Sequence, residues 1–104
     1  MSQKNEQIES SETIRVRVLD CYNIQINRQG KLNDRLSPDE VDNLIVLNKE
    51  NRQLLESVID KLHLSARAYH RILKVARTIA DLDHAQAVEQ RHLIEAIGYR
   101  RHNG

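Results

Sequence analysis

The stretch LHLSARAYHRILKVARTIADL, residues 62–82, has the pattern of one long amphipathic helix. Ser65 stands where an N-cap residue is expected, and Leu64 and Tyr69 occupy the positions of a hydrophobic staple. Arg67 then falls in the first turn, where the helix dipole disfavours a cation by up to ~1 kcal/mol. The side chains that recur at helical spacing predict a buried face made of Tyr69, Ile72, Leu73, Ala76, Ile79 and Ala80.

Four further helices are predicted around this one. The first starts at Ser10 or Ser11, after a disordered polar tail over residues 1–9, and ends at Gly30, a plausible left-handed residue. LSPDEV (36–41) predicts a short helix over 38–47, with an N-cap at Ser37 and a capping box completed by Glu40. A third helix follows Asn48, and a fifth begins near Glu89. The apolar positions expected in the first helix are Ile14, Val18, Cys21, Tyr22 and Ile26. Those expected in the third helix are Leu54, Leu55, Val58, Ile59 and Leu62. Those expected in the fifth helix are Leu93, Ala96 and Ile97.

Composition favours the same fold class. The chain has 104 residues, of which 39% are hydrophobic and only 3% aromatic, with three glycines and one proline. Turn residues are therefore too scarce for a sheet of many strands, and the core must be aliphatic. We expect an all-α fold, a four- to five-helix bundle over residues 10–101, with residues 102–104 as a frayed C-terminus.

Several function classes find no support. The net charge of +1 provides no global field for nucleic acid or membranes, and no apolar run is long enough for a membrane helix. The single cysteine, Cys21, and the polar N-terminus predict a cytoplasmic protein. No Walker A or Walker B motif, GxSxG, HExxH or CxxC occurs, so the chain alone is not expected to be an enzyme. The scattered histidines (His63, His70, His84, His92 and His102) predict surface or rim residues and no metal site. Asp81 and Asp83 are interpreted as solvated turn residues.

The helix over residues 65–82 carries a basic side. Arg67, Arg71 and Lys74 follow one another at i, i+4 and i+7, and Arg77 extends the row. One interpretation is an ordinary solvated face. The other is an anion site, because the free N–H groups of a helix N-terminus and an arginine in the first turn both bind phosphate oxygens. Periodicity does not choose between a nucleotide and a nucleic acid.

Two segments carry a family resemblance. LSARAYHRILKVARTIADL together with HLIEAIGYRR closely resembles the C-terminal helical domain of magnesium-chelatase-like AAA+ ATPases of the ComM (YifB) type. The upstream segment ESSETIRVRVLDCYNIQINRQGKLN, with its RxRV and RQGKLN patterns, is similar to the segment that precedes that domain. The likeness spans roughly residues 9–101 and is most specific over 62–82.

The resemblance implies a lid domain that completes an ATP site. In such a lid the arginine of the SAR motif is sensor 2, which reads the γ-phosphate, so that role falls to Arg67. The implied cofactors, ATP and Mg²⁺, would belong to the full-length protein and would not be bound by this chain alone. The implied partners are the AAA+ core domain, neighbouring subunits of a ring, and DNA in a motor linked to competence and recombination. The isolated domain is expected to be monomeric.

Two other functions stay open at this stage. The row Arg67, Arg71, Lys74 and Arg77 also suits a stand-alone helical nucleic-acid-binding module. A protein-interaction module that docks on another subunit is the third interpretation.

Overall fold

The computed structural model describes the backbone of residues 2–103 and the side chains of residues 11–99. Over the backbone described, the ordered elements are helical and no strand occurs, so the predicted all-α fold is confirmed. The elements are α1 (Ser2–Gln29), the 3₁₀ turn η1 (Asn33–Arg35), α2 (Pro38–Leu44), α3 (Lys49–Lys61), α4 (Ala66–Leu82) and α5 (Gln90–Asn103).

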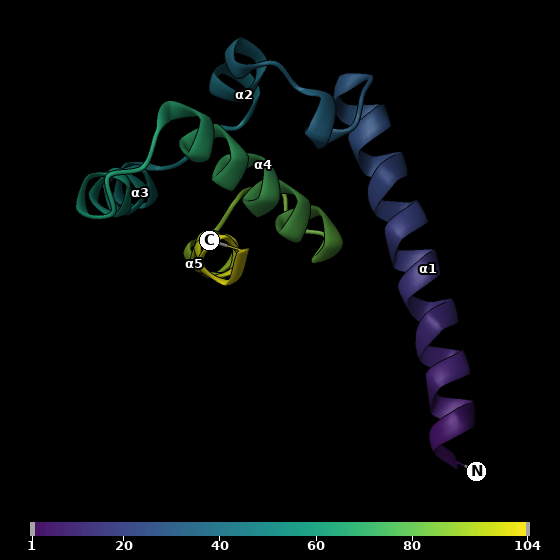
Figure 1. The fold of residues 1–104 in the computed structure, drawn as a ribbon. Coiled ribbons are helices and arrows are strands. Elements are labelled where there is room, and N and C mark those ends of the chain that lie inside the picture. Colours follow the sequence, from purple (N-terminus) through teal and green to yellow (C-terminus); the bar gives the residue numbers. More distant parts are fainter. Residues whose placement is uncertain (1, 104) are drawn as a thin grey trace.

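Helix α4, the stretch quoted above, is the centre of the fold. It contacts α1, α2, η1 and α5, and α3 also packs on α5. Figure 1 shows α4 in the middle of the domain. Helix α1 lies at the edge of the molecule, with its N-terminal end far from the other helices. The buried core is aliphatic, as composition predicts, and consists of Leu36, Val41, Ile45, Leu47, Leu55, Ile72, Leu73, Ala76, Ala80, Val88, Leu93 and Ala96.

Local capping signals set three helix starts. The Ser37 hydroxyl accepts the Glu40 N–H at 3.2 Å, and the Glu40 carboxylate accepts the Ser37 N–H at 2.9 Å, which is the predicted capping box. The side chains of Asn48 and Ser65 likewise accept N–H groups in the first turns of α3 and α4. Gly30 adopts φ = 78°, as expected for the residue that ends α1.

The boundaries of two helices differ from the sequence prediction. Helix α1 includes residues 2–9, which were expected as a tail, because neither glycine nor proline interrupts the chain before Gly30. The side chains of residues 1–10 and 100–104 lie outside the described part. Helix α2 ends at Leu44, earlier than the expected residue 47. The segment after it still buries Ile45 and Leu47, so tertiary packing determines this end.

Some predicted core positions are also wrong. Cys21 is buried as predicted, but Tyr22 and Ile26 are 46% and 47% exposed, because α1 packs on α4 through its other side. Ile14, also predicted as a core position, is 55% exposed. Leu62, at the end of α3, is 46% exposed. No helix in the described part of the chain is long and apolar enough to cross a membrane.

Candidate anion-binding site

Arg67 lies where the sequence placed it, in the first turn of α4. Ser65 is the N-cap, and its hydroxyl accepts the N–H of Ala68 at 3.1 Å. The Arg67 and Arg71 side chains are both exposed, and neither has a hydrogen bond or an ion pair with another described side chain or backbone group. Both guanidinium groups are therefore available to an external anion.

The structure brings three of the predicted basic residues to one depression. Arg67, Arg71 and Lys74 line it from α4, together with Ala66, His70, Pro38 and Asp34, and its volume is about 730 Å³. Lys74 Nζ donates to the backbone carbonyl of Asp34 at 3.3 Å, so the lysine is already directed across the depression. The His70 side chain, which also lines the depression, has its Nε2 3.0 Å from Asp42 Oδ1 of α2. Three cations around an open hollow match the oxygen-rich, negative surface of a phosphate chain.

Arg77 does not belong to this basic face, contrary to the sequence prediction. Its side chain is 7% exposed and turns inward, where it donates to the carboxylate of Asp81 and to two backbone carbonyls in the loop before α5, those of Ala85 and Gln86. The reason is the opposite charge four residues further along the helix, which pairs with Arg77 at 2.8 Å. The basic face is therefore limited to Arg67, Arg71 and Lys74.

Asp81 is the centre of a buried charge cluster, and its interpretation as a solvated turn residue is wrong. Only 1% of it is exposed. Arg28 of α1 donates to both carboxylate oxygens at 2.7 and 3.0 Å, and Asn33 of η1 donates at 3.0 Å. Burial tends to raise the pKa of Asp81, but the hydrogen bonds from Arg28, Arg77 and Asn33 outweigh it and hold the pKa below its ordinary value. The cluster thus joins α1, η1 and α4 through one ionised carboxylate.

This cluster explains the RQGKLN segment, residues 28–33. Arg28 and Gln29 both donate to the Asn33 side-chain oxygen, at 3.1 and 2.7 Å. Lys31 pairs with Glu40 at 3.0 Å, which ties the segment to the capping box of α2. Sequence reasoning missed this role. The available signal was an Arg77–Asp81 pair at i, i+4 within the apolar face of α4.

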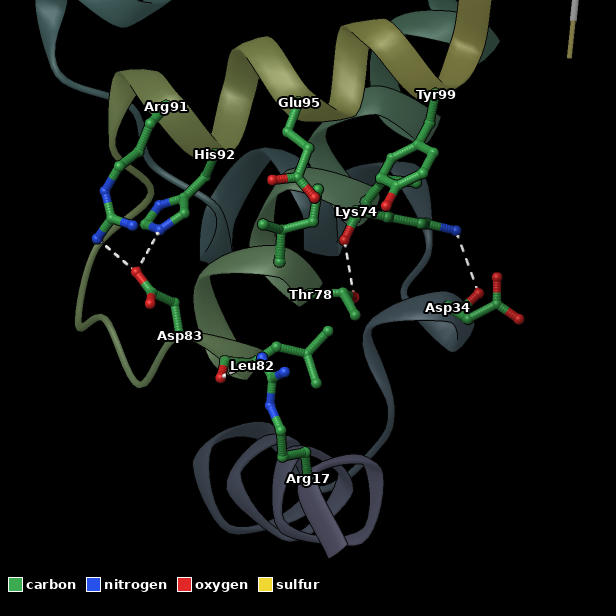
Figure 2. A pocket seen from close by; sticks show the side chains of 12 residues that line it. Arg17, Asp34, Lys74, Thr78, Leu82, Asp83, Arg91, His92, Glu95 and Tyr99 are labelled. Atoms are coloured by element: carbon green, nitrogen blue, oxygen red, sulfur yellow. Dashed lines mark hydrogen bonds and ion pairs between the residues drawn. The ribbon is translucent and has the colours of Figure 1, made fainter. Parts of the chain in front are cut away.

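A second depression, of about 500 Å³, lies between α1, α4 and α5 (Figure 2). Its wall combines apolar side chains of α4 with charges of both signs, including Arg17, Asp83 and Glu95. This mixture gives no preference for an anion or a cation. The second depression therefore offers a weaker case for phosphate than the basic face.

His92, which lines the second depression, is a structural residue. It is 2% exposed, in contrast to the predicted rim position. Its Nδ1 accepts the Glu89 N–H at 2.9 Å, so the ring proton sits on Nε2, which donates to Asp83 at 3.0 Å. The hydrogen bonds from His92 and Arg91 lower the pKa of Asp83. Both ring nitrogens are engaged within the fold, which leaves none for proton transfer to a substrate. Among the described residues, no group of three His, Cys, Asp or Glu side chains could hold a metal ion.

Comparison with known proteins identifies the family. The family model described as magnesium chelatase, subunit ChlI C-terminal, matches residues 8–100. The chain belongs to this family. The match extends from within α1 to within α5 and includes the basic face and the buried charge cluster.

Known relatives from this family are of the ComM and YifB type. The chain is 49% identical over 92 residues to competence protein ComM of Haemophilus influenzae, a match that covers 88% of this chain and 18% of the relative. It is 43% identical over 100 residues to the uncharacterized protein YifB of Salmonella typhimurium, covering 96% and 20%. The chain thus spans about a fifth of the length of these relatives, and the resemblance inferred from its motifs is confirmed.

Proposed function

We propose that this domain is the lid of a magnesium-chelatase-like AAA+ ATPase and that Arg67 acts there as sensor 2. The observation that carries the proposal is the combination of an exposed Arg67 in the first turn of α4 with Arg71 and Lys74 around the same depression. A γ-phosphate brought to this hollow would relieve the unfavourable position of Arg67 in the helix dipole. The Mg²⁺-bound ATP would be held mainly by the ATPase core and would supply the phosphate whose loss the lid senses.

The mechanism is differential binding of two nucleotide states. A guanidinium at the γ-phosphate stabilises the closed lid with ATP and loses that contact after hydrolysis, so the lid position follows the nucleotide. In a ring, such a lid would contact the core of its own subunit or of a neighbour, and the ring would act on DNA. The isolated chain should be a monomer with at most weak affinity for ATP, because three cations alone cannot offset the loss of binding freedom.

The test uses a full-length protein in which this chain replaces the matched region of Haemophilus influenzae ComM. Arg67→Ala should reduce ATP turnover on the order of 10²-fold, as expected for loss of a charged group that stabilises the reacting phosphate. Circular dichroism should stay unchanged because Arg67 is exposed, and thermal unfolding should shift only toward higher stability, by up to ~1 kcal/mol, because a cation is removed from the first turn of α4. The matched control is Arg52→Ala, which removes an exposed arginine of α3, away from the depression. Wild-type turnover in the Arg67 variant would refute the sensor role.

The nucleic-acid alternative has less support than the sequence allowed. With Arg77 buried, only three cations remain on the basic face, and among the described residues no Phe, Tyr or Trp lines the depression, which leaves the His70 ring as its one aromatic group for stacking on bases. Submicromolar and steeply salt-dependent DNA binding by the isolated chain would favour that alternative over the lid.

A further inference from the structure

Helix α1 carries apolar side chains on two opposite sides. One side packs on α4 and buries Cys21 and Gln25, each only 2% exposed. On the other side lie Val16, Leu19, Tyr22 and Ile26, which are 60%, 55%, 46% and 47% exposed; we call these four the outer stripe. Their spacing of three, three and four residues places them along one face of the helix, about half a turn away from Cys21.

A helix that is apolar on both sides normally packs between two partners. Figure 1 shows α1 at the edge of the domain, with the other helices on one side of it only. Because the four side chains are also exposed, the described part of the domain leaves the outer stripe uncovered. Among the described residues, Ile14 is also exposed, on the side of α1 that carries Cys21 but nearer the N-terminus. The remaining large exposed apolar side chains are distributed over four other segments: Leu44, Val46, Leu62, Ile94 and Tyr99. Single exposed apolar residues are ordinary, whereas four along one helix face form a patch that indicates an interface.

A second copy of this chain is a poor occupant. Glu12 and Arg15 continue the line of the outer stripe toward the N-terminus, and both are exposed. Parallel self-pairing would place each charge against its own copy, and antiparallel pairing about Leu19 would place Glu12 against Ile26. The outer stripe is also only ~15 Å long at the rise of an α-helix, too short for a stable homodimer interface of over ~1,000 Å².

We propose that the outer stripe docks on an apolar surface of the ATPase part of the same longer protein. This inference rests on the proposed function, which assigns the chain to a ComM-type protein. About four fifths of the relatives' length lies outside their match to this chain, so a large surface is available to cover the stripe. Asp20, Asn23 and Asn27 flank the stripe along one side, which provides a polar rim on that side of the apolar residues.

The experiment maps contacts in the same full-length chimeric protein. Tyr22 is replaced by the photocrosslinker p-benzoylphenylalanine, and a second version carries it at Val46, which is 69% exposed and belongs to the segment between α2 and α3. We expect an intramolecular crosslink from position 22 to the ATPase part, in a yield several times that from position 46. Leu19→Gln in the same protein should largely abolish that crosslink, whereas Leu44→Gln, at a 50% exposed residue of α2, should leave it unchanged.

Two outcomes would overturn the docking proposal. A crosslink that joins two copies of α1 would identify self-association, and a yield at position 22 no higher than at position 46 would show an uncovered stripe. Adding Arg67→Ala separates this proposal from the sensor role. If the Arg67→Ala variant keeps ATP turnover and position 22 still crosslinks, the docking proposal is supported and the sensor role of Arg67 is refuted. If Arg67→Ala abolishes turnover and position 22 gives no crosslink, the sensor role is supported and the docking proposal is refuted.

Discussion

Two histidines end helices in a backbone conformation that glycine usually adopts. His63 and His84 have φ of 53° and 57°, and each follows a helix whose last turn is closed by a Schellman-type bond. In these bonds the Leu64 N–H donates to Ile59 O at 3.0 Å, and the Ala85 N–H donates to Ala80 O at 2.8 Å. A side chain in this region is disfavoured by roughly 1–2 kcal/mol, so both positions carry local strain.

His63→Gly should therefore stabilise the domain by up to ~1 kcal/mol, after the greater flexibility of glycine in the unfolded chain is subtracted. His63 suits this test because its side chain is exposed, whereas His84 also lies 3.2 Å from Asp20. The measurement is the midpoint of urea unfolding at an unchanged slope. His63→Ala is the matched control and should give no gain, since alanine keeps the strain. Equal stabilisation by both variants would contradict this account.

Asp81 should contribute strongly to the loss of folding stability at low pH. Its pKa is lowered in the folded state, so the unfolded chain binds more protons as pH falls, and stability rises with pH. That contribution is complete above the ordinary value near 3.8 and is lost as pH falls through the lower folded pKa. Asp81→Asn should cost about 3 kcal/mol at pH 7, because it leaves Arg28 and Arg77 without their anion.

The measurement for Asp81 is urea unfolding between pH 7 and pH 2. Below pH 4 the loss of stability should be flatter in Asp81→Asn than in the wild type. Asp39→Asn, at an exposed carboxylate of α2, is the control and should follow the wild-type curve. If stability fell with pH below pH 4 as steeply in Asp81→Asn as in the wild type, other carboxylates would be responsible for the loss of stability in acid.

At the scale of single elements, α2 depends most on its cap. It has only seven residues, too few for a helix without outside support, and the Ser37–Glu40 box satisfies two of its free N–H groups. Ser37→Ala should destabilise the domain by about 1 kcal/mol in urea unfolding. Ser57→Ala, in the exposed middle of α3, should be neutral or slightly stabilising because alanine is the better helix former. Equal effects of the two changes would argue against the capping box.

Helix starts could be predicted because their causes are local. Ser37, Asn48 and Ser65 each cap an N–H group within three residues, and such signals are complete in the sequence. The burial of Arg77 and Asp81 was missed because it depends on Arg28 and Asn33, some fifty residues away. Position 67 was predicted correctly as an exposed first-turn residue, since that follows from the cap and the period of one helix.

At the scale of the whole molecule, α1 is attached to the other helices mainly through its C-terminal part. Its residues Cys21 and Gln25 pack on α4, and Arg28 fixes its C-terminal end to Asp81. Helices α3, α4 and α5 share the aliphatic core, whereas α1, over its described side chains (residues 11–29), adds only Cys21 to the buried apolar side chains. The domain should therefore contain a stable unit of α2–α5 and a more easily released α1.

Arg28→Gln tests this division by hydrogen exchange. Asp81 keeps Arg77 at 2.8 Å and Asn33 at 3.0 Å in this variant, so α4 and α5 should retain their protection. Amides of α1 between residues 18 and 28 should exchange on the order of tenfold faster, which corresponds to about 1.4 kcal/mol of lost attachment. Arg15→Gln, on the same helix but outside the cluster, should change neither set. A uniform rise in exchange over α1, α4 and α5 would mean that the fold opens as one cooperative unit, and that the buried carboxylate secures the whole domain rather than the position of α1.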